Sequence, residues 1–132
     1  MASNPEAARK SIPTVKLLLN GQFVESQSRQ WHDVINPATQ EVLARMPFAT
    51  QDEVNAAVAA AKEAFKTWKN MPIAARARIM LKLQQLIRDN MGRIAQTLTA
   101  EQGKTLADAE GDVFRGLEVV EHACSIGTLQ LG

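Results

Sequence analysis

From residue 50 to the end of the 132-residue chain, apolar residues recur at intervals of three and four. This spacing places them along one face of an α-helix, so the stretch predicts helices rather than strands. The predicted apolar faces comprise Val54, Val58, Ala61, Phe65 and Trp68; Ala77, Met80, Leu83, Ile87, Met91, Ile94 and Leu98; and Leu106, Ala109, Val113, Leu117, Val120 and Cys124. We therefore expect a chain that is mostly helical, with three to four helices after residue 50.

Residue types that begin and end helices divide this stretch. Thr50 and Glu53 have the spacing of a capping box, and Pro72 suits the first turn of the next helix. The sequence around residues 90–92 predicts an interruption of that second helix, and the last helix is expected to run from Leu106 toward Gly127.

The tripeptide Gly103-Lys104-Thr105 is how a phosphate-binding P-loop ends. A P-loop needs a second glycine five positions earlier, where this chain has Leu98 within a helical pattern. We therefore predict a helix junction, in which Gly103 takes the left-handed conformation and Thr105 caps the next helix, with Asp108 completing a capping-box-like pair.

Short strands are predicted before residue 50. Two apolar runs meet at Asn20-Gly21, the dipeptide that best accepts a type I′ turn. Residues 33–35 and 41–46 alternate in a strand-like manner around the turn at 36–39. Residues 1–13 contain two prolines and few apolar residues, which predicts a flexible tail, whereas 14–132 is expected to form one continuous segment.

Composition excludes several classes of function. The 15 basic and 14 acidic residues are spread along the chain, which does not favour nucleic acid or a membrane surface as a partner. The sequence lacks both a membrane-spanning apolar run and a secretory or mitochondrial leader pattern, so we expect a cytoplasmic location. The single cysteine, Cys124, rules out an internal disulfide, and no metal site is expected.

A nucleophile and base pair formed by Cys124 and His122 is rejected on geometry. Residues two apart on a helix point to opposite faces, so these side chains cannot share a hydrogen bond. Cys124 lies on the apolar stripe and is expected to be structural. His32 has no second imidazole nearby and is expected at a strand edge.

One polar face of the last predicted helix has two interpretations. It carries Asp108, Gly111, Arg115, Glu118 and His122, and it could be an ordinary solvated surface on which Arg115 pairs with Glu118. However, Gly111 and Gly116 weaken a helix, which suggests that something approaches closely there. From the residues alone both interpretations stay open.

The segments NPATQEVLARMPFATQDEVNAAVAAAKEAFKTW and EQGKTLADAEGDVFRGLEVVEHACS resemble the amino-terminal portion of the aldehyde dehydrogenase superfamily. The second segment looks most like the CoA-acylating methylmalonate-semialdehyde branch, through Phe-Arg-Gly-Leu-Glu-Val-Val-Glu-His-Ala-Cys. The resemblance covers about residues 14 to 132. It implies an α/β fold, in which this chain is the amino-terminal part of the NAD-binding domain.

The resemblance also implies a reaction for the complete enzyme. A cysteine thiolate attacks the aldehyde, hydride passes to NAD, CO₂ is lost and the acyl group leaves on coenzyme A. Methylmalonate or malonate semialdehyde thereby yields propionyl-CoA or acetyl-CoA, as in valine or inositol catabolism. The resemblance implies a homotetramer and places the catalytic cysteine, the glutamate base and the NAD-holding residues downstream of this segment, so no catalytic or cofactor-binding residue is assigned here.

By the same resemblance, the helix after Thr105 lines the aldehyde entrance, and Arg115 binds the carboxylate of the semialdehyde. A guanidinium suits this task because it stays charged and can bind a carboxylate with two parallel hydrogen bonds. The alternatives are a fragment of another aldehyde dehydrogenase branch and a non-enzymatic helical interaction module. Because Leu129 and Leu131 in the final stretch GTLQLG are apolar and lack the polar fraying typical of a terminus, we expect a piece of a longer protein.

Overall fold

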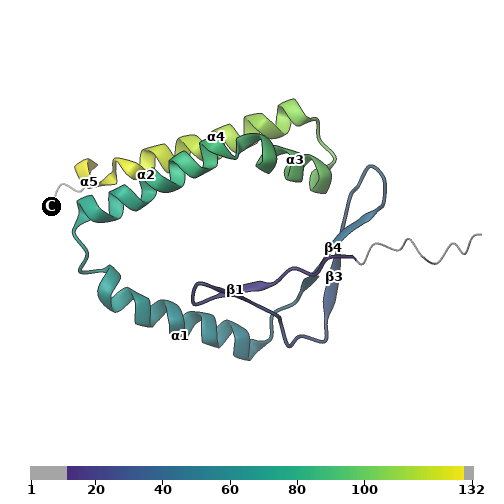
Figure 1. The fold of residues 1–132 in the computed structure, drawn as a ribbon, viewed down its shortest axis with the longest axis horizontal. Helices are drawn as coiled ribbons and strands as arrows, with labels where there is room; N and C mark the ends of the chain where they lie inside the picture. The colour runs from purple at the N-terminus through teal and green to yellow at the C-terminus, as the bar shows by residue number, and fades with distance from the viewer. Residues whose placement is uncertain (1–11, 130–132) are drawn as a thin grey trace, which may run out of the picture. The chain divides into compact units, whose positions relative to one another are not determined.

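The computed structural model describes residues 12–129 (Figure 1). Most of the tail expected at 1–13, and the last three residues, lie outside the described residues. The chain divides into two compact units, one ending at Val58 and one beginning at Ala59. In chain order the described elements are β1 (Leu17–Leu19), β2 (Gln22–Val24), β3 (Trp31–Ile35), β4 (Val42–Pro47), α1 (Gln51–Trp68), α2 (Ile73–Asp89), α3 (Met91–Gln102), α4 (Leu106–Cys124) and α5 (Ile126–Leu129).

The first unit begins with a tight hairpin. Strands β1 and β2 are antiparallel, and Asn20 and Gly21 between them have φ angles of 50° and 76°. Two consecutive residues in the left-handed region define a type I′ turn, whose twist matches that of the flanking strands. The turn predicted from Asn20-Gly21 is therefore confirmed.

A second antiparallel hairpin joins β3 to β4. The Asn36 side chain accepts a hydrogen bond from the Ala38 amide at 2.9 Å, and Gln40 takes a left-handed φ of 63° to enter β4. Strand β3 begins two residues before the predicted 33–35, and β4 is displaced by one residue from the predicted 41–46. The backbone of Pro13 is tied to this hairpin, because its carbonyl accepts from the Arg45 amide at 2.9 Å.

Helix α1 begins with the predicted capping box. The Thr50 amide donates to the Glu53 carboxylate at 2.7 Å, and the Glu53 amide donates to the Thr50 hydroxyl at 3.3 Å. The predicted apolar face forms, but Val54, Val58 and Phe65 are 45%, 50% and 57% exposed. The described part of the chain therefore covers this face only in part.

The helices of the second unit follow the predicted division. Helix α2 ends at Asp89 and α3 begins at Met91, so the interruption falls at Asn90, as expected. Helix α4 packs against α2 and α3, and Figure 1 shows it running alongside α2. The buried residues at this contact are small or apolar: Ala95, Ala109 and Leu117.

Two expectations for the last helix need correction. Leu106 was expected on the buried stripe but is 42% exposed, because it lies in the first turn, beyond the packed part of α4. The helix also ends at Cys124 rather than continuing to Gly127. The Ser125 hydroxyl donates to the His122 carbonyl at 2.8 Å, and the short helix α5 follows.

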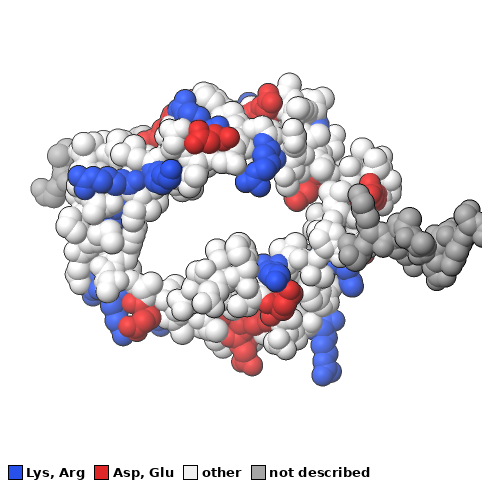
Figure 2. Space-filling view, in the orientation of Figure 1, with Lys and Arg blue, Asp and Glu red and all other residues white. Residues whose placement is uncertain are grey.

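Charges of both signs are interspersed on the face of the molecule shown in Figure 2. This distribution agrees with the even spread of basic and acidic residues along the sequence. None of the helices that the structure describes has the length and apolar character needed to cross a bilayer.

Candidate functional site

The tripeptide Gly103-Lys104-Thr105 joins α3 to α4 and forms a helix junction. Gly103 has φ 74° and ends α3 in the left-handed conformation, with its amide donating to the Thr99 carbonyl at 2.8 Å. Thr105 then caps α4, because its hydroxyl accepts from the Asp108 amide at 3.3 Å. Both predicted roles are confirmed, and the backbone of this tripeptide is shaped by the two helix ends.

The Asp108 carboxylate does not complete a capping box. It pairs with Lys104 Nζ at 3.0 Å, and among the described contacts it accepts nothing from the Thr105 amide. An aspartate has one methylene fewer than the glutamate of a capping box, and a lysine ammonium lies within its reach. The expectation of a reciprocal pair was therefore only half right.

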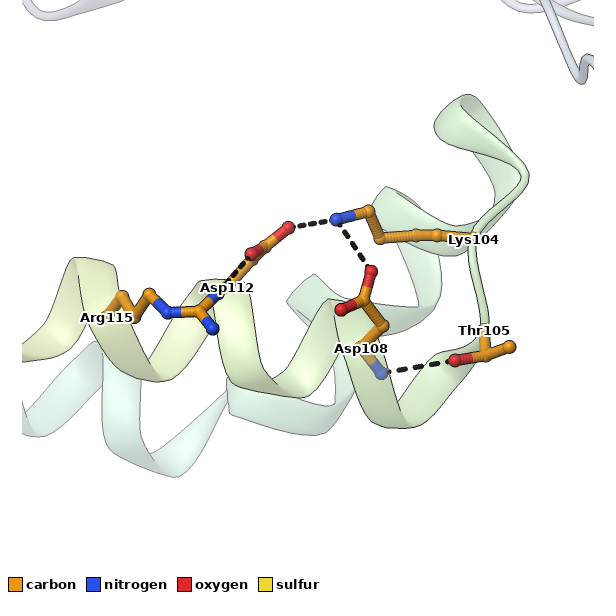
Figure 3. Close-up of polar contacts among 5 residues, drawn as sticks. All are labelled: Lys104, Thr105, Asp108, Asp112 and Arg115. Atoms are coloured by element: carbon orange, nitrogen blue, oxygen red, sulfur yellow. Dashed lines mark hydrogen bonds and ion pairs between the residues drawn. The ribbon is translucent and has the colours of Figure 1, made fainter.

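A chain of charged side chains runs from Lys104 along α4 (Figure 3). Lys104 Nζ lies between the carboxylates of Asp108 and Asp112, and it donates to Asp112 Oδ2. The other oxygen, Asp112 Oδ1, accepts from Arg115 Nη1 at 2.8 Å. These four residues, which we call the α4 charge network, link the helix junction to Arg115.

Hydrogen bonding within the α4 charge network favours the charged forms of Lys104 and Asp112. The hydrogen bonds to Asp112 and then to Asp108 raise the pKa of Lys104 above its ordinary value. The hydrogen bond from Lys104 lowers the pKa of Asp112. Two positive and two negative groups therefore coexist at neutral pH, and their formal charges cancel.

Arg115 is the most exposed member of the network. Its side chain is 72% exposed, against 23% for Lys104 and 35% for Asp112. A guanidinium has five N–H donors, and the described contacts use one of them, toward Asp112. A surface pair with Glu118 was one of the two interpretations left open by the sequence, and in the structure Arg115 pairs with Asp112 instead.

The glycines of α4 do not receive a neighbour from this chain. A Cβ atom built on Gly111 or Gly116 would meet no other atom within 4 Å in the described structure. The close approach inferred from these glycines therefore has no counterpart among residues 12–129.

Cys124 and His122 lie at the end of α4, away from the α4 charge network. Cys124 is half-buried and lines a hollow beside Ile73 and Ala77, whereas His122 is exposed. An adjoining apolar pocket of about 240 Å³ lies between α2 and the end of α4, lined by Trp68, Ile73, Arg76, Ala77, Met80, Ala123 and Ile126. The described residues that line this hollow carry no basic side chain.

No cluster of three or more potential metal ligands occurs within residues 12–129. His32 lies in β3, is exposed, and has its ring 6.1 Å from that of Phe48. Lys104, the residue that would contact phosphate in a P-loop, is instead occupied by two aspartates. The contacts of Lys104 are therefore those of a helix junction rather than of a phosphate loop.

Comparison with known proteins gives the chain a family. A model described as the aldehyde dehydrogenase family matches residues 23–130. The chain belongs to the aldehyde dehydrogenase family. Membership argues against an independent helical module, because the apolar face of α1 and the glycine face of α4 are then parts of a larger enzyme fold.

Similar proteins in this family include enzymes of one branch. An Arabidopsis thaliana protein named methylmalonate-semialdehyde dehydrogenase [acylating], mitochondrial, is 60% identical over 134 aligned positions, covering 100% of this chain and 22% of that protein. The Homo sapiens methylmalonate-semialdehyde/malonate-semialdehyde dehydrogenase [acylating], mitochondrial, is 56% identical over 92% of this chain and 23% of its own length. This chain thus spans about a quarter of the length of these relatives.

Solved structures agree with this likeness. A Sinorhizobium meliloti 1021 protein, assigned provisionally as a methylmalonate-semialdehyde dehydrogenase and solved with NAD, superposes with a TM-score of 0.88 at 36% identity. The alignment covers 93% of this chain and 25% of that one. The methylmalonate-semialdehyde dehydrogenase of Oceanimonas doudoroffii gives 0.87 at 36% identity, over 92% and 25%.

The sequence reasoning identified Arg115 but missed Lys104 and Asp112. The signal was present, because Lys104, Asp108 and Asp112 are spaced by four, and Asp112 precedes Arg115 by three. Such spacings bring side chains together on a helix. Lys104 was overlooked because it precedes the helix and was considered only as part of a phosphate loop.

Proposed function

We propose that this chain is the amino-terminal part of an NAD-dependent, CoA-acylating methylmalonate-semialdehyde dehydrogenase. The observation that carries the proposal is the identity of 55% to 60% to proteins of that name over 92% to 100% of the chain. In the proposed reaction, methylmalonate semialdehyde, NAD⁺ and CoA give propionyl-CoA, CO₂ and NADH. Malonate semialdehyde would give acetyl-CoA in the same way.

This chain would contribute to substrate recognition rather than to bond making. The cysteine nucleophile, the glutamate base and the groups that hold NAD and CoA are expected downstream, outside this sequence. When bound, NAD accepts the hydride and CoA accepts the acyl group. Residues 14–132 would form the amino-terminal segment of the NAD-binding domain, with the apolar face of α1 covered by the remainder of the protein.

Arg115 is the residue through which the chain would recognise its substrate. We propose that its guanidinium binds the carboxylate that distinguishes a semialdehyde acid from a simple aldehyde. The support is its position on the glycine-bearing face of α4, its 72% exposure and its use of one N–H donor among the described contacts. Because Asp112 accepts from one N–H group of the guanidinium, other N–H groups on a different edge can bind an incoming carboxylate.

Cellular location and assembly also belong to this proposal. The cytoplasmic location expected from the sequence is kept as a proposal, and the Arabidopsis and human relatives are named as mitochondrial. We propose a cytosolic homotetramer. Subcellular fractionation of the source cells, and light scattering of the complete protein, would test these two points.

The experiment that tests the function uses the complete protein encoded by the reading frame that contains this sequence. Purified protein is supplied with methylmalonate semialdehyde, NAD and CoA, and the products are identified by mass spectrometry. We expect NADH, CO₂ and propionyl-CoA in equal amounts. Formation of free methylmalonate with CO₂ retained, or a preference for propanal, would assign the protein to another aldehyde dehydrogenase branch.

A further inference from the structure

We propose that Lys104 is a positioning residue for substrate recognition, acting on Arg115 through Asp112. The inference rests on the proposed function, in which Arg115 binds the substrate carboxylate. Lys104 lies three helical turns of sequence away from Arg115 and touches it only through the aspartate (Figure 3). Its effect on the substrate would therefore be indirect.

The two oxygens of Asp112 are divided between two partners. Oδ2 accepts from Lys104 Nζ, and Oδ1 accepts from Arg115 Nη1 at 2.8 Å. A carboxylate with both oxygens free tends to pair with arginine through two parallel hydrogen bonds. Lys104 prevents this by occupying one oxygen, so Asp112 holds the guanidinium without covering the donors that a substrate carboxylate needs.

Charge leads to the same conclusion. Lys104 and Arg115 balance Asp108 and Asp112, so an anionic substrate approaches a network whose formal charges cancel. Without Lys104 the network would carry a net negative charge beside the binding arginine. Repulsion between like charges would then oppose the substrate carboxylate but not a neutral aldehyde.

The position of Lys104 also allows it to restrict the motion of the Arg115 side chain. Its side chain is 23% exposed, and its backbone lies between the left-handed Gly103 and the cap residue Thr105. Arg115 has a long side chain, and most of its surface is exposed. Contacts with other side chains are therefore needed to keep it in one conformation. These contacts are the hydrogen bond from Lys104 to Asp112 and the hydrogen bond from Arg115 to Asp112, which connect the guanidinium to the helix junction.

The test measures kcat and KM of the complete enzyme for methylmalonate semialdehyde and for propanal. Lys104→Met should lower kcat/KM for the semialdehyde about fivefold, mainly through KM, since exposed charge pairs have effects of this order. Propanal should change by less than about twofold. Lys104→Arg should restore most of the selectivity, because an arginine can also bridge the two aspartates.

Lys66→Met is the matched control. Lys66 donates to Glu63 at 2.6 Å in an exposed pair with the same spacing of three as Arg115 and Asp112, but it lies on α1. Its loss should leave the kinetics of both substrates unchanged. Equal losses on both substrates in Lys104→Met would show a structural role and overturn the inference.

The Arg115→Leu background separates this inference from the proposed function. If Lys104 acts through Arg115, adding Lys104→Met to Arg115→Leu should cause no further loss of selectivity. A selective loss with Arg115→Leu but not with Lys104→Met would overturn the positioning role alone. A nonselective result with Arg115→Leu itself would overturn the carboxylate-binding role on which the inference rests.

Discussion

Helices α1 and α4 begin with the same local pattern, a threonine followed three residues later by an acidic residue, yet the acidic residues do different things. At the start of α1, Glu53 accepts from the Thr50 and Gln27 amides, both at 2.7 Å, and from the Ser26 hydroxyl at 3.0 Å. At the start of α4, the Asp108 carboxylate pairs with Lys104 rather than with the Thr105 amide.

The difference separates a structural helix start from one that leads to a candidate binding residue. The Glu53 carboxylate accepts hydrogen bonds from the Thr50 and Gln27 amides and from the Ser26 hydroxyl. It therefore connects the loop before α1 to the helix. The carboxylates of Asp108 and Asp112 instead bind side chains, and the outermost of these, Arg115, uses one of its N–H donors among the described contacts. A local pattern predicts where a helix starts, but the length of one side chain decides what the carboxylate binds.

The largest expected effect is the absence of enzyme activity in this chain by itself. The 132-residue chain alone, supplied with NAD, CoA and methylmalonate semialdehyde, should form no NADH above the blank, because neither region holds an activated nucleophile. The complete enzyme at equal molar concentration is the positive control. If the chain did form NADH, and Cys124→Ala abolished that activity, Cys124 would be a nucleophile and the prediction would be wrong.

An intermediate effect distinguishes the two carboxylates directly. Glu53→Ala should speed amide hydrogen exchange at Thr50 and Gln27 about fivefold in the complete enzyme, because these amides lose their acceptor. Asp108→Ala should leave exchange at the Thr105 amide within about twofold. Equal acceleration in the two variants would mean that Asp108 caps α4 in solution after all.

The smallest effect is a difference in pH sensitivity. Backbone hydrogen bonds from Thr50 and then Gln27 lower the pKa of Glu53 from 4.5, so its stabilisation is present above that value and is lost as pH falls through the lowered one. Asp112 behaves likewise, below its ordinary 3.8. The pKa of Lys104 is raised from 10.5, so its contribution is present below that value and is lost as pH rises through the raised one.

Circular dichroism of two peptides can measure this difference. A peptide of residues 49–69 should lose the Glu53 contribution to helicity on acidification, and Glu53→Gln should remove that change. A peptide of residues 102–124 should lose helicity on both acidification and strong alkalinisation, and Lys104→Met should remove the alkaline change. An alkaline change that survives in Lys104→Met would contradict the assignment.

The features that the sequence predicted well are those that depend on neighbouring residues. The type I′ turn at Asn20-Gly21, the left-handed Gly103 and the capping box at Thr50 are set by local backbone geometry and short side-chain reach. Burial was predicted less well. The apolar residue Phe65 is 57% exposed because a periodic pattern identifies a face to be covered without supplying what covers it.

The candidate site was only partly predictable for a related reason. Arg115 was identified through a resemblance to a family, whereas the residues alone left the interpretation as a solvated surface open. Its pairing with Asp112 follows from helical spacing, whereas the participation of Lys104 depends on the path of the chain between α3 and α4. That path became clear only when Gly103 and Thr105 were placed in three dimensions.

The central claim is that Arg115 recognises the carboxylate of the substrate. The most direct measurement is kcat/KM of the complete enzyme for methylmalonate semialdehyde and for propanal, in the wild type and in Arg115→Leu. We predict a loss of roughly 30-fold or more for the semialdehyde and less than about twofold for propanal, which has no carboxylate to bind. Equal losses on the two substrates, or no loss on either, would contradict the claim.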